Sequence, residues 1–214
     1  NEEGYAMTQN SLGQSYQGLA ALGVEPEQNL KSSITVLQKA SELKKAKKDE
    51  AGFVIIQNSI GISYQRLAQW GIEPKENLNL SINLLKEAAK LGKKQPDGAL
   101  YAMTQHNMGM GYQALAQWGI EPEQSLALSI AALLEAVQLR KEQKDALGYF
   151  TSQNSLGMSY QALAQWGVEP QKNLTLSIEA LTMAAQLGNE QQNKSGYASS
   201  KKGLGVSYHA LAQQ

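Results

Sequence analysis

Apolar side chains recur along this chain at three- and four-residue steps, the spacing of an amphipathic helix. The first stripe comprises Tyr5, Gln9, Leu12, Tyr16, Leu19 and Ala20, and the second comprises Leu30, Ile34, Leu37, Ala40 and Leu43. A polar stretch at residues 44–50 follows the second stripe, and the two-residue alternation typical of strands is scarce. The pattern therefore predicts pairs of helices joined by short turns.

The pair of stripes returns every 48 residues, as shown by the glycines Gly13, Gly61, Gly109, Gly157 and Gly205. A fixed period of this size is the mark of a solenoid, in which each unit buries its apolar face against its neighbours. We therefore expect one all-α domain over residues 1–214. Its repeats fall approximately at residues 4–51, 52–99, 100–147 and 148–195, followed by a half-repeat at 196–214.

Particular residues mark the inside and the ends of each predicted helix. Gly13 and its equivalents lie inside the first helix, where glycine costs about 1 kcal/mol relative to alanine, so we expect the partner helix to approach closely there. Gly23 is placed for a left-handed C-terminal cap, and residues 24–26 form the turn. Asn29 is a favourable N-cap type for the second helix, as are its equivalents Asn77, Ser125 and Asn173.

Composition and charge exclude several classes of function. Lys and Arg total 19, as do Asp and Glu, so the formal net charge is zero, which argues against nucleic-acid and membrane-surface partners. The absence of cysteine excludes disulfides and thiolate chemistry and fits cytoplasm and periplasm equally. Because the N-terminus lacks the regions of a signal peptide and no long apolar run occurs, we expect a cytoplasmic protein.

The repeat carries a recognisable motif in each helix. Leu12, Gly13 and Tyr16 give LG-x-x-Y, and Ser33, Ile34, Leu37 and Ala40 give S-I-x-x-L-x-x-A. This combination resembles the tetratricopeptide repeat, although the unit of that family has only about 34 residues. The segment with Gly167, Val168, Glu169, Ala184, Ala185, Leu187 and Gly188 is similar to the related Sel1-like repeat. Residues 5–13 are similar to long-unit arrays of bacterial signalling proteins.

The resemblance implies both an architecture and a role. It implies a right-handed superhelical solenoid of four full repeats plus one terminal helix, with the first helix of each repeat lining a concave groove. It also implies a scaffold that binds a protein or an extended peptide. Arrays of this kind often adjoin caspase-like peptidase or NTPase modules, which this chain lacks, and its abrupt start suggests a segment excised from a larger bacterial signalling protein.

Helical geometry leaves one face of each first helix opposite the core stripe. The first row on this face contains Met7, Ile55, Met103, Thr151 and Ser199, and the second contains Asn10, Asn58, His106, Asn154 and Lys202. The third contains Gln14, Ile62, Met110, Met158 and Val206, and the fourth contains Gln17, Gln65, Gln113, Gln161 and His209. A plain solvated face would carry Lys and Glu, whereas this one carries amides and methionines and almost no charge.

These rows suggest a groove for an extended peptide. Amides can donate to and accept from a peptide backbone, and methionine adapts to varied apolar side chains. The alternative is that the amides bond adjacent first helices to each other. We prefer the groove for the row that contains Asn58, and the packing role for Gln57, Gln105 and Gln153 on the core stripe.

Other candidate chemistry is weaker. His106 and His209 are the only histidines and have no acidic or thiolate companions, so the sequence predicts no metal site, cofactor or catalytic constellation. The lysine run at residues 44–48 is interpreted as a solvated helix end. Trp70, Trp118 and Trp166 either stack on the prolines of the following turn, which we prefer, or form a ladder of exposed anchors.

Two alternatives to a peptide scaffold remain open. The first is a structural or self-associating array, because Leu204, Tyr208 and Leu211 are left available for a second helix and could stack head-to-tail on another molecule. The second is an enzyme, for which the sequence nominates no substrate.

Overall fold

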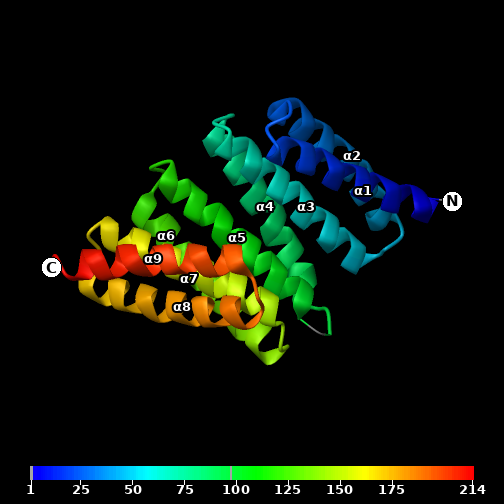
Figure 1. Cartoon of the computed structure of the whole chain (residues 1–214). Coiled ribbons are helices and arrows are strands. Elements are labelled where there is room, and N and C mark those ends of the chain that lie inside the picture. Colours follow the sequence, from blue (N-terminus) through cyan, green and yellow to red (C-terminus); the bar gives the residue numbers. More distant parts are fainter. Residues whose placement is uncertain (1, 97) are drawn as a thin grey trace. The chain divides into compact units, whose positions relative to one another are not determined.

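The computed structural model describes residues 2–96 and 98–214, and every regular element within them is an α-helix (Figure 1). The nine described helices are α1 (Glu2–Ala21), α2 (Pro26–Ala46), α3 (Glu50–Gln69), α4 (Pro74–Gly92), α5 (Ala99–Gln117), α6 (Pro122–Glu142), α7 (Ala146–Gln165), α8 (Pro170–Glu190) and α9 (Lys194–Leu211). Odd-numbered helices, the first of each repeat, are called A helices and even-numbered ones B helices. The predicted helix pairs are confirmed.

Helices pack mainly against their neighbours in the chain, which gives a repeat-like array consistent with a solenoid. The chain divides into two compact units, Asn1–Ala114 and Leu115–Gln214. In the first unit α2 packs between α1 and α3, and α3 also packs on α4. In the second unit α7 packs between α6 and α8, and α8 also packs on α9. None of the described helices is long and apolar enough to cross a membrane.

The core of each unit is built from leucines of the B helices. Leu30 and Leu37 of α2 pack with Ile60 and Leu67 of α3 in the first unit. In the second unit Leu126 and Leu133 of α6 pack with Leu156 and Leu163 of α7. These are the apolar stripes of the sequence pattern, so burial of an apolar helix face organises both units.

The glycine inside the A helix allows a B-helix leucine to lie against the backbone. A Cβ added at Gly13 would lie 2.6 Å from Leu37 Cγ, and one added at Gly157 would lie 2.5 Å from Leu181 Cγ. Gly61 has the same relation to Leu85, at 3.1 Å. The predicted close approach is therefore confirmed at these three glycines.

The turn between the helices begins as predicted but ends earlier. Gly23 adopts the left-handed conformation with φ 79°, and the Val24 N–H donates to Leu19 O. Glu25 is also left-handed, and Pro26 opens α2. The prediction that Asn29 is the N-cap is wrong, because proline at the first helical position starts the helix before it.

Asn29 instead secures the turn from within the first turn of α2. Its side-chain amide donates to Val24 O at 2.7 Å. The equivalent side chains repeat the bond at the other three turns, from Asn77 to Ile72 O, Ser125 to Ile120 O and Asn173 to Val168 O. The position therefore requires a short side chain that donates a hydrogen bond.

Candidate functional site

Asn58 does not lie on a free face. Its side chain is 2% exposed, and its Nδ2 donates to Val54 O and to Thr104 Oγ1, the latter at 2.8 Å. Its Oδ1 accepts from Asn107 Nδ2 at 2.8 Å. The expectation that Asn58 faces a groove is wrong, since the amide holds α3 to α5.

The other residues of this row differ in how much they contribute to the packing between helices. Asn154 is half-buried and its Oδ1 accepts from Ser200 Oγ at 2.9 Å, which joins α7 to α9. Asn10 is half-buried and its Oδ1 lacks a hydrogen-bond partner, and Ile56 stands where Ser200 follows Asn154 in the fourth repeat. His106 is half-buried and Lys202 is exposed.

Most residues of the fourth row also take part in the packing between helices. Gln17 Nε2 donates to Ser59 O and Ser63 Oγ, at 2.9 and 2.8 Å. Gln65 Nε2 donates to Asn107 O at 2.8 Å and to Ser81 Oγ at 3.1 Å. Gln17, Gln65 and Gln113 are buried and Gln161 is half-buried, so the expected exposure of this row is wrong.

Serine hydroxyls link these amides to the B helices. Ser33 Oγ of α2 donates to Gly13 O at 2.9 Å and lies 3.1 Å from Ser63 Oγ of α3. In the second unit Ser177 Oγ donates to Gly157 O and lies 2.9 Å from Ser207 Oγ. The small polar positions beside the helix glycines thus form a buried seam between A and B helices.

The apolar rows, by contrast, remain accessible. In the first unit Met7 is 63% exposed and Ile55 is 40% exposed, on the neighbouring helices α1 and α3. Met103, Ile62 and Met110, which belong to the same rows, are half-buried. We call these five residues the apolar A-helix face. Met158, on α7 of the second unit, is exposed.

The tryptophans stand at helix ends and are about half exposed. Trp70 follows α3 directly and Trp166 follows α7. Trp70 borders an open groove of about 900 Å³ whose other walls include Tyr16, Pro26 and Ile72. Lys31 in this groove is paired with Glu27 at 2.6 Å. The proline that shares this groove with Trp70 is Pro26, from the turn of the preceding repeat, and not the proline of the turn that follows Trp70.

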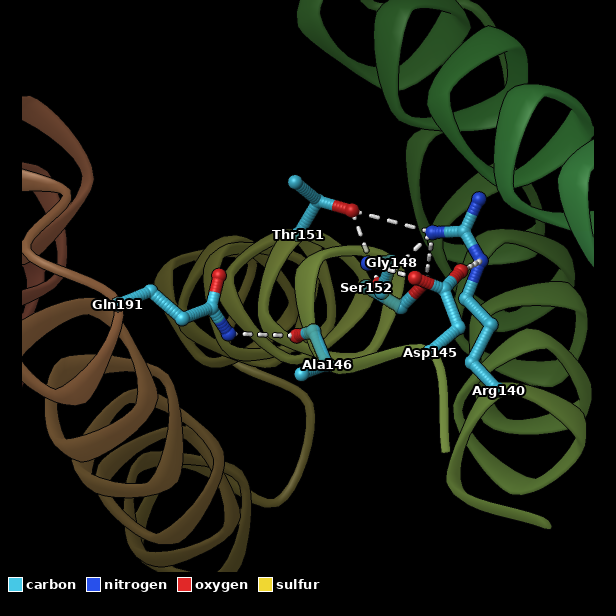
Figure 2. A network of polar contacts seen from close by, with 7 residues as sticks. All are labelled: Arg140, Asp145, Ala146, Gly148, Thr151, Ser152 and Gln191. Carbon is cyan, nitrogen blue, oxygen red and sulfur yellow. Dashed lines mark hydrogen bonds and ion pairs between the residues drawn. The ribbon is translucent and has the colours of Figure 1, made fainter. Parts of the chain in front are cut away.

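A polar network that the sequence pattern did not predict surrounds Arg140 between α6 and α7 (Figure 2). The Arg140 side chain is buried, and its Nη1 donates to Gly148 O, Thr151 Oγ1 and Ser152 Oγ at 2.8 to 3.0 Å. Burial lowers the pKa of the guanidinium, and Asp145, 3.8 Å from Nε, opposes that shift. The network fixes the start of α7.

Lys44 and Asp49 occupy the equivalent places in the first unit. Lys44 Nζ lies 2.6 Å from Asp49 Oδ2, and Asp49 Oδ1 accepts from the Gly52 N–H at the start of α3. The Lys44 hydrogen bond and then the Gly52 N–H lower the pKa of Asp49. The interpretation of this lysine run as solvated is therefore wrong for Lys44. A basic residue five positions before aspartate, repeated 96 residues apart, was the signal available in the sequence.

No family model and no curated protein sequence matches this chain. Among the described residues no group of three or more His, Cys, Asp or Glu side chains could hold a metal ion. The exposed surfaces are therefore the features from which a function can be inferred.

Proposed function

We propose that the chain is a protein-interaction scaffold of tetratricopeptide-like repeats, which binds an extended peptide on the apolar A-helix face. The observation that carries the proposal is the exposure of Met7 and Ile55 on adjacent A helices, while the amides between the rows are buried. Large exposed apolar side chains on neighbouring helices are typical of interaction sites. Methionine is flexible enough to fit several apolar side chains.

The buried amides change the chemistry expected of the ligand. Asn58, Gln17 and Gln65 already donate to protein groups, so they are not available to a peptide backbone. Recognition would rest on apolar contacts with the peptide's side chains. Asn10 is half-buried three residues after Met7, and its Oδ1 has no hydrogen-bond partner, so it is the polar group best placed to contribute.

A peptide selection tests this proposal. Twelve-residue peptides selected on the wild-type chain should be rich in apolar side chains. The double variant M7E/I55E should weaken their binding by at least about tenfold, because charge is introduced into an apolar contact. Isothermal titration calorimetry measures the Kd, and thermal unfolding checks that the variant remains folded.

The matched control is M183E, which places the same charge on an exposed methionine of the B helix α8. Binding to M183E should equal binding to the wild type. Equal affinity of the selected peptides for M7E/I55E and the wild type would contradict the proposal.

Self-association is the second candidate function. Leu12 and Leu19 of α1 are exposed, whereas the equivalent Ile60 and Leu67 of α3 are buried against α2. An exposed apolar strip of this kind could pack against a second copy. Light scattering over a concentration series would show a mass that rises with concentration.

A further inference from the structure

The groove beside Trp70 combines aromatic surface with carboxylates. It has a volume of about 900 Å³ and is lined by the turn that joins α1 to α2, the first half of α2 and the turn after α3. Tyr16 and the half-exposed Trp70 supply the aromatic surface, and Glu25 and Glu27 supply the carboxylates. We call it the Trp70 groove. All of its lining residues lie in the first unit, and none belongs to the apolar A-helix face.

Glu25 has a backbone conformation that is unfavourable for glutamate. Its φ is 37°, in the left-handed region that glycine, asparagine and aspartate tolerate best. Its side chain makes no capping hydrogen bond, and its carboxylate is exposed. The dipole at the start of α2 favours an acidic side chain there, but aspartate would satisfy it with less strain. Glutamate nevertheless recurs with positive φ at the other three turns, as Glu73, Glu121 and Glu169.

Carboxylates outnumber cations around this groove. Among the described residues that line it, Lys31 alone is basic, and its Nζ lies 2.6 Å from Glu27 Oε1. The hydrogen bond to Glu27 and then the charge of Glu27 raise the pKa of Lys31 above its ordinary value of 10.5, and the charge of Glu73 acts in the same direction. Glu73, from the next turn, is therefore close enough to act on Lys31. Together with Glu25 and Glu27 it makes the groove attractive to a further cation.

Arginine matches these groups better than lysine does. A planar guanidinium can stack on an aromatic ring and also donate paired hydrogen bonds to a carboxylate, whereas an ammonium is more strongly hydrated and acts as a point charge. The groove volume lies within the range of about 300 to 1,000 Å³ that is typical of ligand sites. It therefore has room for an arginine side chain and parts of the residues beside it.

We propose that the Trp70 groove binds an arginine side chain of a partner protein. The guanidinium would stack on Trp70 and donate to the carboxylate of Glu25, while Lys31 remains paired with Glu27. Exposed ion pairs are individually weak, so the aromatic contact would supply most of the affinity and the carboxylate most of the preference for a cation. The proposal holds whether or not a peptide binds on the apolar A-helix face.

Two matched peptide libraries test this proposal. The probes are heptapeptides with arginine at the centre and random uncharged residues at the other six positions. In the counterpart library citrulline, which has the same shape without the charge, replaces arginine. Both libraries are passed over the immobilised full chain, and isothermal titration calorimetry gives the Kd of the retained peptides. Arginine peptides should bind at least about fivefold more tightly than the same sequences with citrulline, because only arginine forms a charge-assisted pair.

Variants of the chain locate the binding. Trp70→Ala removes the stacking surface and should weaken binding of the arginine peptides by at least about tenfold. Glu25→Gln should weaken it by about threefold to tenfold and remove the preference for arginine over citrulline. Lys31→Ala should strengthen binding by about twofold, because a competing cation is lost. Glu87→Gln, at an exposed position of α4 outside the groove, is the matched control and should bind like the wild type.

Glu25→Gly separates a binding role from a structural one. Glycine fits the left-handed conformation, so this variant should raise the urea denaturation midpoint while weakening peptide binding as Glu25→Gln does. A lower midpoint would show that the glutamate serves the fold and would count against the proposal.

Loss of binding in Trp70→Ala and Glu25→Gln, with Glu87→Gln unchanged, supports the arginine site. If Trp70→Ala does not fold, Glu25→Gln decides alone. Failure of every arginine peptide to bind the wild type overturns the proposal. Equal affinity of arginine and citrulline peptides, or unchanged binding in Glu25→Gln, overturns it as well.

Discussion

At the scale of single residues, the buried amide side chains of Asn58, Gln17 and Gln65 each make at least two hydrogen bonds, at least one of them to another helix. Asn58 bonds its own helix and α5, and Gln17 bonds two groups of α3. Helical geometry from the sequence placed these residues opposite the core stripe but could not show the neighbouring A helix. The polar residue 46 positions later, Thr104 for Asn58 and Ser63 for Gln17, was the available signal.

The helix glycines give the sharpest prediction at this scale. Gly157→Ala should destabilise the chain by about 1 to 3 kcal/mol, because the added Cβ overlaps Leu181. Gly205→Ala should instead stabilise it by about 0.5 to 1 kcal/mol, since nothing opposes the gain in helix propensity. Urea denaturation measures both changes in the free energy of unfolding. Changes of the same sign would show that the two glycines do not differ as described.

At the scale of helices, several interactions fix the helix ends, and only some of them can be predicted from the sequence. Left-handed Gly23 and the turn before Pro26 follow from residue type alone, and the structure confirms the cap. The role of Asn29 could not be predicted from the sequence. An asparagine near a helix start suggests an N-cap, and residue type alone does not show that the helix already begins before it. Arg140 was missed because a basic residue near a helix end is usually solvated.

The stability that Asp49 contributes at the start of α3 should depend on pH. The Lys44 hydrogen bond holds the pKa of Asp49 below its ordinary value of 3.8 in the folded chain. A carboxyl whose pKa is lowered by folding stabilises the folded state above its unfolded pKa, and this contribution is lost as the pH falls through the folded pKa. The effect should be small, because the side chain is partly exposed.

Comparison of Asp49→Asn with the wild type isolates this contribution. The wild type should lose more stability than Asp49→Asn when the pH is lowered from 6 to about 2.5. Urea denaturation midpoints at the two pH values measure the difference. Identical losses in the two proteins would mean that the Lys44–Asp49 pair does not contribute.

At the scale of the whole chain, the 48-residue period predicts the alternation of A and B helices, and the structure confirms it within the described residues. Periodicity specifies which faces must be buried by neighbouring repeats, so architecture follows from it. Periodicity does not specify a ligand. Some positions that vary between repeats are buried amides and others are exposed apolar side chains, and this difference is visible only once the neighbouring helices are in place.

Methyl NMR of the methionines tests the central claim most directly. The chain has six methionines, of which Met7, Met103 and Met110 lie on the apolar A-helix face and Met183 lies on α8. When a selected peptide is titrated into methyl-labelled protein, the resonances of Met7 and Met103 should shift while that of Met183 stays unchanged. Unchanged Met7 and Met103 resonances at saturating peptide would contradict binding on this face.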